Sequence, residues 1–560
     1  MKKRLCIFLS IIMLGCFSGC KTNENTQNGG ATDGTHTHEY TLVSPKKPTC
    51  TEKGNSAYYI CECGKIFTKK GTIYVETTPD TVSLNPTGHI YAEEKVSDEY
   101  FLSEATETTP QIFAKSCISC GEKSESDTFT YGKTLAEYKN EDKSLYAPNC
   151  LTMSLYNAAH CIYGFTWNTE TEPARPVLNI KNKADGEEQS IRADFIVADS
   201  YSLENGKDQG IKYYSCKAKI SLEPSTEYLY SVGDKYLNVY TETTEIKTVN
   251  SSQTESWRFV HVSDSQVEGD VNNGGIGTGK EFSYVLKNVS TLSDVKFIVH
   301  TGDVVEYSKY QSYWVNMLNE NFNYLSKIPV MAISGNHETT YKCGTNETFN
   351  RFYYDIPQQE TDLGFYYSFS YGNVKFLMLN TNRLNGTKLT SDQYSWLENE
   401  LKNKTEKWTI VAMHNPMYSV GKWGSDPGKN AVAVALANQL NSLFVRYKVD
   451  VVLQGHDHMV SRTHPLNYDG AAVKENRKTI NGTEYIEEPN GVIYVMNGPA
   501  GNQARNEIYN HDDSLYAYAK RSRPSSWAEF EVSQNLLTVT VKTANSGTAE
   551  KIISWGIKKK

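Results

Sequence analysis

Six polar side chains in the second half of the chain follow apolar, strand-like runs and could together bind metal ions. Two are carboxylates, three are imidazoles and one is a carboxamide: Asp264, Asp303, His414, His456, His458 and Asn336. These oxygen and nitrogen donors suit divalent Mn, Fe or Zn ions rather than a structural zinc site of four cysteines. His456 and His458 are two residues apart, so both face the same way on an extended segment. The residue types therefore predict a site for divalent metal ions.

The segments that must position these residues alternate between strand-like and helix-like patterns. The strand-like runs are 257–264, 295–303, 328–338, 374–382, 407–416, 449–458 and 491–498. Helix-like stretches lie between several of them, at 281–292, 391–403 and 430–447. This order favours a layered α/β domain. Because open α/β sheets place ligands just beyond their strand ends, we expect the six residues to converge in one pocket.

Five short blocks contain the six residues, in this order: Asp264-Ser265-Gln266, Gly302-Asp303-Val304-Val305-Glu306, Gly335-Asn336-His337-Glu338, His414-Asn415-Pro416-Met417-Tyr418 and Gly455-His456-Asp457-His458. The set resembles calcineurin-like metallophosphoesterases, most of all the branch related to purple acid phosphatases. The resemblance implies that Asp303 bridges two metal ions. It implies that Asp264 and His458 complete the first site, and that Asn336, His414 and His456 complete the second. His337 would assist the departing oxygen as a general acid.

The resemblance also implies a reaction. Two divalent metal ions (Mn, Fe or Zn) would clamp the phosphoryl oxygens and activate a bound hydroxide for in-line attack on phosphorus. The expected function is a metal-dependent hydrolase of phosphoric esters, acid phosphatase-like, acting on a small phosphoester. Preference for monoesters or diesters stays open. The alternative is a surface adhesion or wall-binding protein that uses the phosphoesterase fold as a scaffold with little activity.

Two positions depart from the pattern of the family. Many members have His two residues after the first Asp, where this chain has Gln266. Its amide is either a weak metal ligand or a contact to substrate or water. Purple enzymes have an iron-binding Tyr three residues after the bridging Asp, and here that position is Glu306. We therefore expect a colourless enzyme that does not require iron(III), with Glu306 either functional or an ordinary solvated acid.

Residues 146–249 alternate with a period of two, in short runs separated by turns. This pattern is typical of a β-sandwich. The segment Leu222-Glu223-Pro224-Ser225-Thr226-Glu227-Tyr228-Leu229-Tyr230-Ser231-Val232-Gly233-Asp234 resembles fibronectin-III-like domains, in the version that precedes purple-acid-phosphatase-type catalytic domains.

Residues 36–145 contain two degenerate copies of a small module, each with a His, a Pro/Thr segment and a close Cys pair followed by Gly. They resemble small repeats on surface proteins of anaerobic bacteria. In the first copy a structural zinc ion could bind the following residues: His38, Cys50, Cys61 and Cys63. The second copy has Thr106 near the place of the middle Cys. A spacer or wall-binding module is the alternative, with cell-wall contact as its function.

The N-terminus combines a basic start, an apolar run over residues 5–19 and small residues before Cys20. A run this short suits a signal peptide rather than a membrane span. The pattern resembles the lipobox of bacterial lipoproteins, with lipidation at Cys20 and Cys16 as the competing site. We expect a secreted protein on the extracellular face of the cell membrane, attached to it by the lipid anchor only.

Composition and length complete the prediction. The net charge is −8 and no long basic stripe is present, so nucleic acid is not an expected partner. The predicted chain is multidomain: a lipoprotein signal peptide (1–20), a flexible tether (21–35), two small His/Cys β repeat modules (36–145), a fibronectin-III-like β-sandwich (146–249) and a four-layer α/β/β/α metallophosphoesterase domain (250–560).

Overall fold

The computed structural model describes residues 37–198, 203–204, 207–208, 213–250, 252, 255–268, 280–308, 310–339, 366–424, 430–501, 508–509, 511–521, 525–545 and 548–560. The predicted signal peptide, Cys20 and the tether lie outside these residues. The chain divides into two compact units, one of residues 1–95 and 114–129 and one of residues 96–113 and 130–560. Among the described residues, none of the helices has the length and apolar character needed to cross a membrane.

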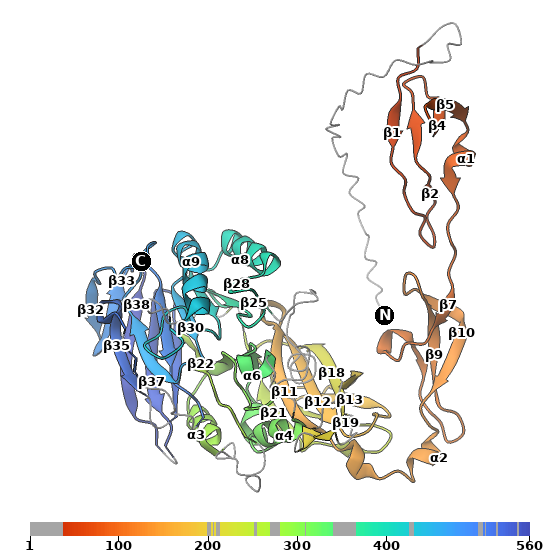
Figure 1. Cartoon of the computed structure of the whole chain (residues 1–560). Helices are drawn as coiled ribbons and strands as arrows, with labels where there is room; N and C mark the ends of the chain where they lie inside the picture. The colour runs from red at the N-terminus through yellow and green to blue at the C-terminus, as the bar shows by residue number, and fades with distance from the viewer. Residues whose placement is uncertain are drawn as a thin grey trace. The chain divides into compact units, whose positions relative to one another are not determined.

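The smaller unit is built from short antiparallel strands (Figure 1). One sheet has the order β1 (Thr41–Val43), β3 (Tyr58–Ile60), β4 (Ile66–Lys70), β5 (Ile73–Thr77), and beside it β2 (Gly54–Asn55) pairs with β6 (Ser83–Leu84). Another sheet has the order β10 (Lys123–Tyr131), β9 (Gln111–Cys117), β7 (Tyr91–Glu93); β8 (Phe101–Ser103), which pairs with β9, belongs to the larger unit. Helix α1 (Pro79–Val82) is a single turn. These sheets are too small to bury many apolar side chains, so other interactions must help to hold the unit together.

Two antiparallel sheets follow in the larger unit. The first has the order β11 (Asn149–Asn157), β12 (Ile162–Thr169), β18 (Tyr213–Ser221), β15 (Asp194–Ala198). The second has the order β14 (Glu188–Arg192), β13 (Pro176–Asn182), β19 (Glu227–Asp234), β20 (Val239–Tyr240), with β21 (Thr244–Lys247) also on β19. In β19 the buried side chains alternate as the sequence predicts: Tyr228, Tyr230 and Val232.

Two larger sheets carry the predicted α/β pattern. The eight-stranded sheet has the order β24 (Val330–Ala332), β23 (Val295–His300), β22 (Trp257–Val262), β36 (Ser526–Val532), β37 (Leu536–Thr543), β38 (Lys551–Lys558), β33 (Thr483–Glu487), β32 (Arg477–Ile480). The seven-stranded sheet has the order β25 (Tyr367–Tyr371), β26 (Val374–Met378), β29 (Trp408–Ala412), β30 (Val451–Gln454), β34 (Ile493–Asn497), β31 (Met459–Thr463), β35 (Tyr516–Arg521). In each sheet, neighbouring strands with helix-containing connections run parallel, namely β22–β23–β24 and β26–β29–β30.

The described helices and minor elements complete the unit. The α-helices are α2 (Leu135–Tyr138), α3 (Lys280–Val289), α4 (Gln311–Asn319), α5 (Phe322–Leu325), α6 (Asn336–Thr339), α8 (Ser391–Asn403) and α9 (Ala431–Arg446). The 3-10 helices are η1 (Asp98–Tyr100), η2 (Lys143–Tyr146), η3 (Ala158–His160) and η5 (Asp513–Leu515). Two short strand pairs remain, β16 (Leu203–Glu204) with β17 (Lys207–Asp208) and β27 (Leu384–Asn385) with β28 (Lys388–Leu389).

The core between the two large sheets is aromatic. Phe259 of β22 stacks on Phe530 of β36 with ring centroids 4.6 Å apart, and it meets Phe376 of β26 edge to face at 5.2 Å. The next residue of β26, Leu377, points the other way and packs with buried leucines of α8 and α9. This alternation gives the seven-stranded sheet two buried faces, as expected for parallel strands. The packed sheets hold the strand ends rigidly.

Candidate metal centre

The predicted ligands lie just beyond the carboxyl ends of parallel strands. Asp264, Asp303 and Asn336 follow β22, β23 and β24 of one sheet, and His414 and His456 follow β29 and β30 of the other. His458 directly precedes β31. Since these strand ends meet at one edge of the two sheets, residues that lie far apart in the sequence come together, as predicted.

The donor atoms form two contiguous groups. Asp303, His414 and His456 offer donor atoms that all lie within 4.8 Å of one another. His414 Nε2 lies 3.3 Å from Asp303 Oδ2 and 3.0 Å from Asn336 Oδ1. In the second group, His458 Nε2 lies 3.5 Å from Asp264 Oδ1. These spacings match the edges of a coordination shell with bonds of about 2.0–2.2 Å.

The chemistry of this donor set fits a metal centre. Asp264 and Asp303 are each 1% exposed, and an ionised carboxylate at such depth is costly unless it is paired or coordinates a metal. Burial acts to raise the pKa of Asp303, but the charges of His414 and His337 outweigh it and hold that pKa well below its usual range. The site therefore keeps the Asp303 carboxylate ionised and ready to bind a cation.

The imidazole of His414 is held in the tautomer that metal binding needs. His414 Nδ1 donates a hydrogen bond to the carbonyl oxygen of Thr301 at 2.8 Å, which leaves Nε2 to face Asp303 and Asn336. Burial alone would lower the pKa of His414, but the charge of Asp303 raises it to about 9. Burial lowers the pKa of His456 to about 3. A hydrogen bond from the second ring nitrogen to a backbone carbonyl is the usual way to orient a metal-binding imidazole.

The backbone at the site is held in unusual conformations. Four non-glycine residues have a positive φ: +52° at Asp264, +40° at Gln266, +54° at Asp303 and +73° at His456. Such conformations cost free energy and persist only where the surrounding structure enforces them, and they gather at functional sites. Here they turn the side chains inward directly after the strands.

Two glycines of the sequence blocks make the close approach possible. A Cβ atom at Gly335 would lie 2.1 Å from Asp303 Oδ1. One at Gly455 would lie 2.4 Å from Ser263 Oγ and 3.0 Å from His414 Nδ1. No side chain fits at either position, so these glycines are needed for packing around the ligands rather than for chemistry.

His337 lies beside the metal ligands and is 7% exposed. Its Nδ1 donates to the backbone oxygen of Glu306 at 2.7 Å, and its Nε2 lies 3.6 Å from Asp303 Oδ2 and 3.0 Å from Gln266 Nε2. Gln266 therefore contacts the predicted general acid. Glu306 is also 7% exposed, and its Oε2 lies 3.3 Å from His337 Nδ1. It is a buried neighbour of His337, so its interpretation as a solvated acid is wrong.

Sequence reasoning gave no role to two residues that shape the site. Glu338 is completely buried and accepts hydrogen bonds from the backbone amides of Asp303, Val304 and Gly335 at 2.8–3.0 Å. Its position in the third sequence block was the feature that could have indicated this role. Trp423 lies with its ring centroid 5.2 Å from that of His456, and its amide donates to Asp457 at 3.1 Å. Nothing in the sequence around Trp423 indicates this contact.

The cysteine-rich residues of the smaller unit are grouped differently from the prediction. His38, Cys61 and Cys63 do come together, with His38 Nδ1 3.3 Å and 3.4 Å from the two sulfur atoms. Cys50 does not belong to this group. Cys50 lies in a second group of possible metal ligands, together with His89, Cys117 and Cys120. The assignment of Cys50 to the His38 group is therefore corrected, because the Gly88 amide donates to the Cys50 carbonyl and holds it beside the second copy.

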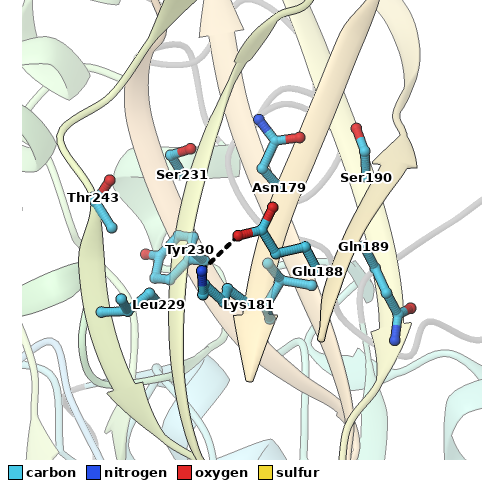
Figure 2. Close-up of a pocket in the computed structure, with 10 residues that line it drawn as sticks. Asn179, Lys181, Glu188, Gln189, Ser190, Leu229, Tyr230, Ser231 and Thr243 are labelled. Carbon is cyan, nitrogen blue, oxygen red and sulfur yellow. Dashed lines mark hydrogen bonds and ion pairs between the residues drawn. The ribbon is translucent and has the colours of Figure 1, made fainter. Parts of the chain in front are cut away.

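A separate open pocket of about 590 Å³ lies on the sheet formed by β13, β14 and β19 (Figure 2). Lys181 and Glu188 form an ion pair there, with Nζ and Oε1 2.6 Å apart. None of the predicted metal ligands lines this pocket, and its rim consists of ordinary strand side chains. We assign it no function.

Comparison with known proteins finds a matching family and several relatives. Residues 258–460 match the calcineurin-like phosphoesterase family. The chain is 25% identical to probable inactive purple acid phosphatase 24 of Arabidopsis thaliana over 58% of each chain. It is 26% identical to purple acid phosphatase 15 of the same plant, over 36% of this chain and 34% of that one. A nucleotide pyrophosphatase/phosphodiesterase of Hordeum vulgare is 25% identical over 44% of this chain and 73% of that one.

Solved structures show the same fold. Purple acid phosphatase PPD1 from yellow lupin (Lupinus luteus) seeds superimposes with a TM-score of 0.61 at 19% identity, covering 74% of this chain and 75% of that one. PhoD superimposes with a TM-score of 0.50 at 12% identity, covering 75% and 95%. The chain spans less than two thirds of the length of the two Arabidopsis relatives. Residues 258–460 are therefore similar to calcineurin-like phosphoesterases, and two of the three plant relatives named above are described as purple acid phosphatases.

Proposed function

We propose that this protein is a metal-dependent hydrolase of phosphoric esters with a dinuclear centre. One observation supports this more than any other: the donor atoms of Asp303, His414 and His456 lie within 4.8 Å of one another, with Asn336 beside His414, while Asp264 and His458 form a second pair at the same edge of the sheets. Asp303 would bridge the two ions. Asp264 and His458 would complete one site, and Asn336, His414 and His456 the other. When bound, two divalent ions clamp phosphoryl oxygens and lower the pKa of a water molecule.

The residues of the chain would do the remaining work. Because the Nδ1 proton of His337 is held by the Glu306 carbonyl, any second proton must sit on Nε2, which faces Asp303. From there it could be donated to the oxygen of the departing alcohol, as general acid catalysis requires. Gln266 would orient the imidazole, since its amide nitrogen lies 3.0 Å from the same His337 nitrogen and donates to it when that nitrogen carries no proton. The side chains of His337, Gln266 and Asp303 are all buried, which excludes bulk water from the proton transfer.

Glu306 determines which metal ions we expect and whether the enzyme is coloured. A carboxylate in this position cannot form a tyrosinate bond to iron(III). We therefore propose a colourless enzyme with two divalent ions of Mn, Fe or Zn, acting on small phosphoesters.

The location and domain organisation are proposed from the sequence patterns. The sequence patterns support a secreted lipoprotein anchored at Cys20. In chain order the His/Cys modules come between this anchor and the catalytic domain, and they would be available for cell-wall contact. The two antiparallel sheets of residues 149–247 support a fibronectin-III-like domain. The two large sheets with flanking helices support a four-layer α/β/β/α arrangement.

The test is hydrolysis of p-nitrophenyl phosphate and bis-p-nitrophenyl phosphate with added Mn²⁺. We expect Asp303→Asn to lose activity by more than about 100-fold, because it removes the shared charge. We expect His337→Ala to lose about 10²–10⁴-fold, the usual size of general acid catalysis. Matched controls are Asp469→Asn and His160→Ala, which change exposed side chains of the same unit. If the wild type hydrolyses neither ester, or all four variants retain its rate, the chain is better explained as an adhesion protein on a phosphoesterase scaffold.

A further inference from the structure

The smaller unit contains a cluster of three thiols and one imidazole that the hydrolase reaction does not use. It brings together residues from both copies of the repeat. We propose that one zinc ion is bound here, held by four side chains: Cys50, His89, Cys117 and Cys120. Three thiols and one imidazole are a donor set typical of structural zinc sites.

The distances fit tetrahedral coordination. Cys50 Sγ and Cys117 Sγ lie 3.7 Å apart, and Cys120 Sγ lies 3.4 Å from His89 Nδ1. A tetrahedral zinc ion with Zn–S bonds of about 2.3 Å and Zn–N bonds of about 2.0 Å separates two sulfurs by about 3.8 Å, and sulfur from nitrogen by about 3.5 Å. A disulfide would need a sulfur–sulfur distance of about 2.05 Å, so the cluster has the shape of a metal site and not of a bridge.

The neighbouring residues orient the ligands. The other ring nitrogen of His89, Nε2, lies 3.4 Å from Glu122 Oε2, which is the imidazole–carboxylate pairing found behind zinc ligands. The Cys117 amide donates to the Glu122 carbonyl, and the Gly121 amide donates back to the Cys117 carbonyl. Gly121 has φ +75°, which closes the tight turn between the two cysteines and Glu122. Cys50 and Cys117 are 7% and 1% exposed, so they are placed inside the unit rather than on its surface.

The site explains two irregular features of the repeats. The second copy supplies His89, Cys117 and Cys120 but has Thr106 near the place of the middle Cys, and the missing thiol is Cys50 of the first copy. The middle Cys of one copy therefore serves the copy that follows it. The His38 group has three members among the described residues.

Binding at this site would cross-link successive repeats. The Thr87 and Gly88 amides already donate to the carbonyls of Thr49 and Cys50, so the first copy's turn and the start of the second are held together beside the cluster. Zinc would replace three thiol protons with three Zn–S bonds and accept the neutral His89 nitrogen, releasing those protons to solvent. Because small sheets bury little apolar surface, the free energy of metal binding would become folding free energy of the unit.

The test uses the full chain in a background that removes the other group, with His38→Ala, Cys61→Ser and Cys63→Ser. Cobalt(II) is the probe, because thiolate-to-cobalt charge transfer reports sulfur ligands and the oxygen and nitrogen ligands around Asp303 do not produce it. We expect this background to bind one cobalt with a thiolate band that zinc abolishes. Adding Cys50→Ser should lower the band by about a third, since one of three thiolates is lost, and weaken zinc binding at least about tenfold.

The matched control is Cys161→Ser in the same background. Cys161 is a buried thiol of the larger unit whose hydrogen bond to the Val249 carbonyl a serine hydroxyl can replace, so the band should not change. The proposal is overturned if the background variant gives no thiolate band even with cobalt in excess over all three proposed metal sites of the chain. It is equally overturned if Cys50→Ser leaves the band intact, or if mass spectrometry of the unmutated secreted chain finds Cys50 joined to Cys117 with two hydrogens lost.

Discussion

Glu338 shows how a single buried residue fixes the geometry around Asp303. Its Oε2 accepts from the amides of Asp303 and Gly335, and its Oε1 accepts from the amide of Val304. Burial, together with the nearby charge of Asp303, raises the pKa of Glu338 to about 8. The hydrogen bonds from the Gly335 and Asp303 amides act in the opposite direction, because they favour the ionised carboxylate, which accepts on both oxygens. The residue therefore acts on the metal centre through the backbone that carries Asp303.

We expect Glu338→Gln to weaken metal binding about 10–100-fold, the usual effect of disturbing a group that orients a ligand. The glutamine NH₂ would face backbone N–H groups where an acceptor is needed. Competition with a chelator for Mn²⁺ measures the change, and Glu320→Gln, at the solvent-accessible end of α4, is the control. An unchanged Mn²⁺ affinity in Glu338→Gln would show that the three amide contacts do not position Asp303.

The six candidate ligands could be chosen from the sequence because each is a chemically distinctive residue in a recognisable block. Glu338 belongs to one of these blocks, but the sequence alone does not distinguish a buried carboxylate that accepts hydrogen bonds from backbone amides from an acidic residue on the surface. Cys50 was assigned to the wrong group for a similar reason. Its partner Cys117 is 67 residues away, and spacing along the chain favoured the nearer Cys61.

At the scale of elements, the turns after the parallel strands determine whether the donor atoms can meet. The β24–α6 turn passes so close to Asp303 that Gly335 has no room for a side chain. The residues on either side of this contact belong to different strand ends of the eight-stranded sheet. Moving one turn would therefore move two ligands, Asp303 and Asn336.

We expect Gly335→Ala to lower both hydrolysis and metal affinity, by about 100-fold in rate, because misplacement of a reacting group by about 1 Å has that cost. The new Cβ would otherwise lie 2.1 Å from Asp303 Oδ1. Steady-state kinetics at saturating Mn²⁺ checks the rate. Gly386→Ala is a control, since a Cβ there meets no atom within 4 Å, although its positive φ adds a small backbone cost.

A second contact between elements joins residues 104–105 to β13 and the β19–β20 turn. Glu104 receives hydrogen bonds from Arg175, at 3.0 Å, and from Lys235, at 2.9 Å, while Tyr236 donates to the same carboxylate. Burial acts to raise the pKa of Glu104, but the hydrogen bonds from these donors lower it to about 2, and the one from Arg175 has the largest effect. The Arg175 side chain is 9% exposed, so its charge depends on this partner.

We expect Glu104→Gln to lower the free energy of unfolding of the larger unit at pH 7 by about 1–2 kcal/mol, less than for a fully buried pair because Glu104 is 37% exposed. The folded pKa lies below the ordinary value of 4.5, so the wild-type contribution is present above pH 4.5 and declines as the pH falls towards 2. Urea unfolding measures the free energy of unfolding at pH 7 and pH 3. The difference in this free energy between variant and wild type should be smaller at pH 3 than at pH 7. Glu107→Gln, in an exposed pair with Lys139, should change little at either pH.

Most strands and helices of the α/β region could be predicted, because buried parallel strands are long apolar runs and the helices between them are amphipathic. The hairpin β32–β33 was not predicted. Three of the four residues of β32 are exposed, and only Tyr485 and Ile486 of β33 are buried, so the apolar pattern is too short to recognise. The available signal was its turn, Asn481-Gly482, where both residues have a positive φ as a tight two-residue hairpin requires.

At the scale of the whole chain, the predicted boundary at residues 249–250 passes through a continuous core. Buried residues of β11, β12 and β19 pack in the same cluster as those of β22, β23 and β24. Polar contacts cross as well: the Tyr230 hydroxyl donates to the Ser326 carbonyl at 2.7 Å, and the Cys150 amide donates to Asn319 at 2.8 Å. The sequence shows where the periodicity changes but cannot show that both patterns share one core, so residues 130–560 form a single compact unit.

This organisation leads to a prediction about metal removal. Because the ligands come from both large sheets, ions at the centre would tie the sheets together, and metal binding would stabilise the whole larger unit. Ligand linkage gives about 2.7 kcal/mol at a free Mn²⁺ concentration 100 times the dissociation constant. We expect calorimetry to show a higher unfolding temperature for the larger unit with Mn²⁺ than after chelation, and Asp303→Asn to lose this response. A response that persists in Asp303→Asn would place the stabilising ions elsewhere, since that variant keeps the shape of the side chain and removes only its charge.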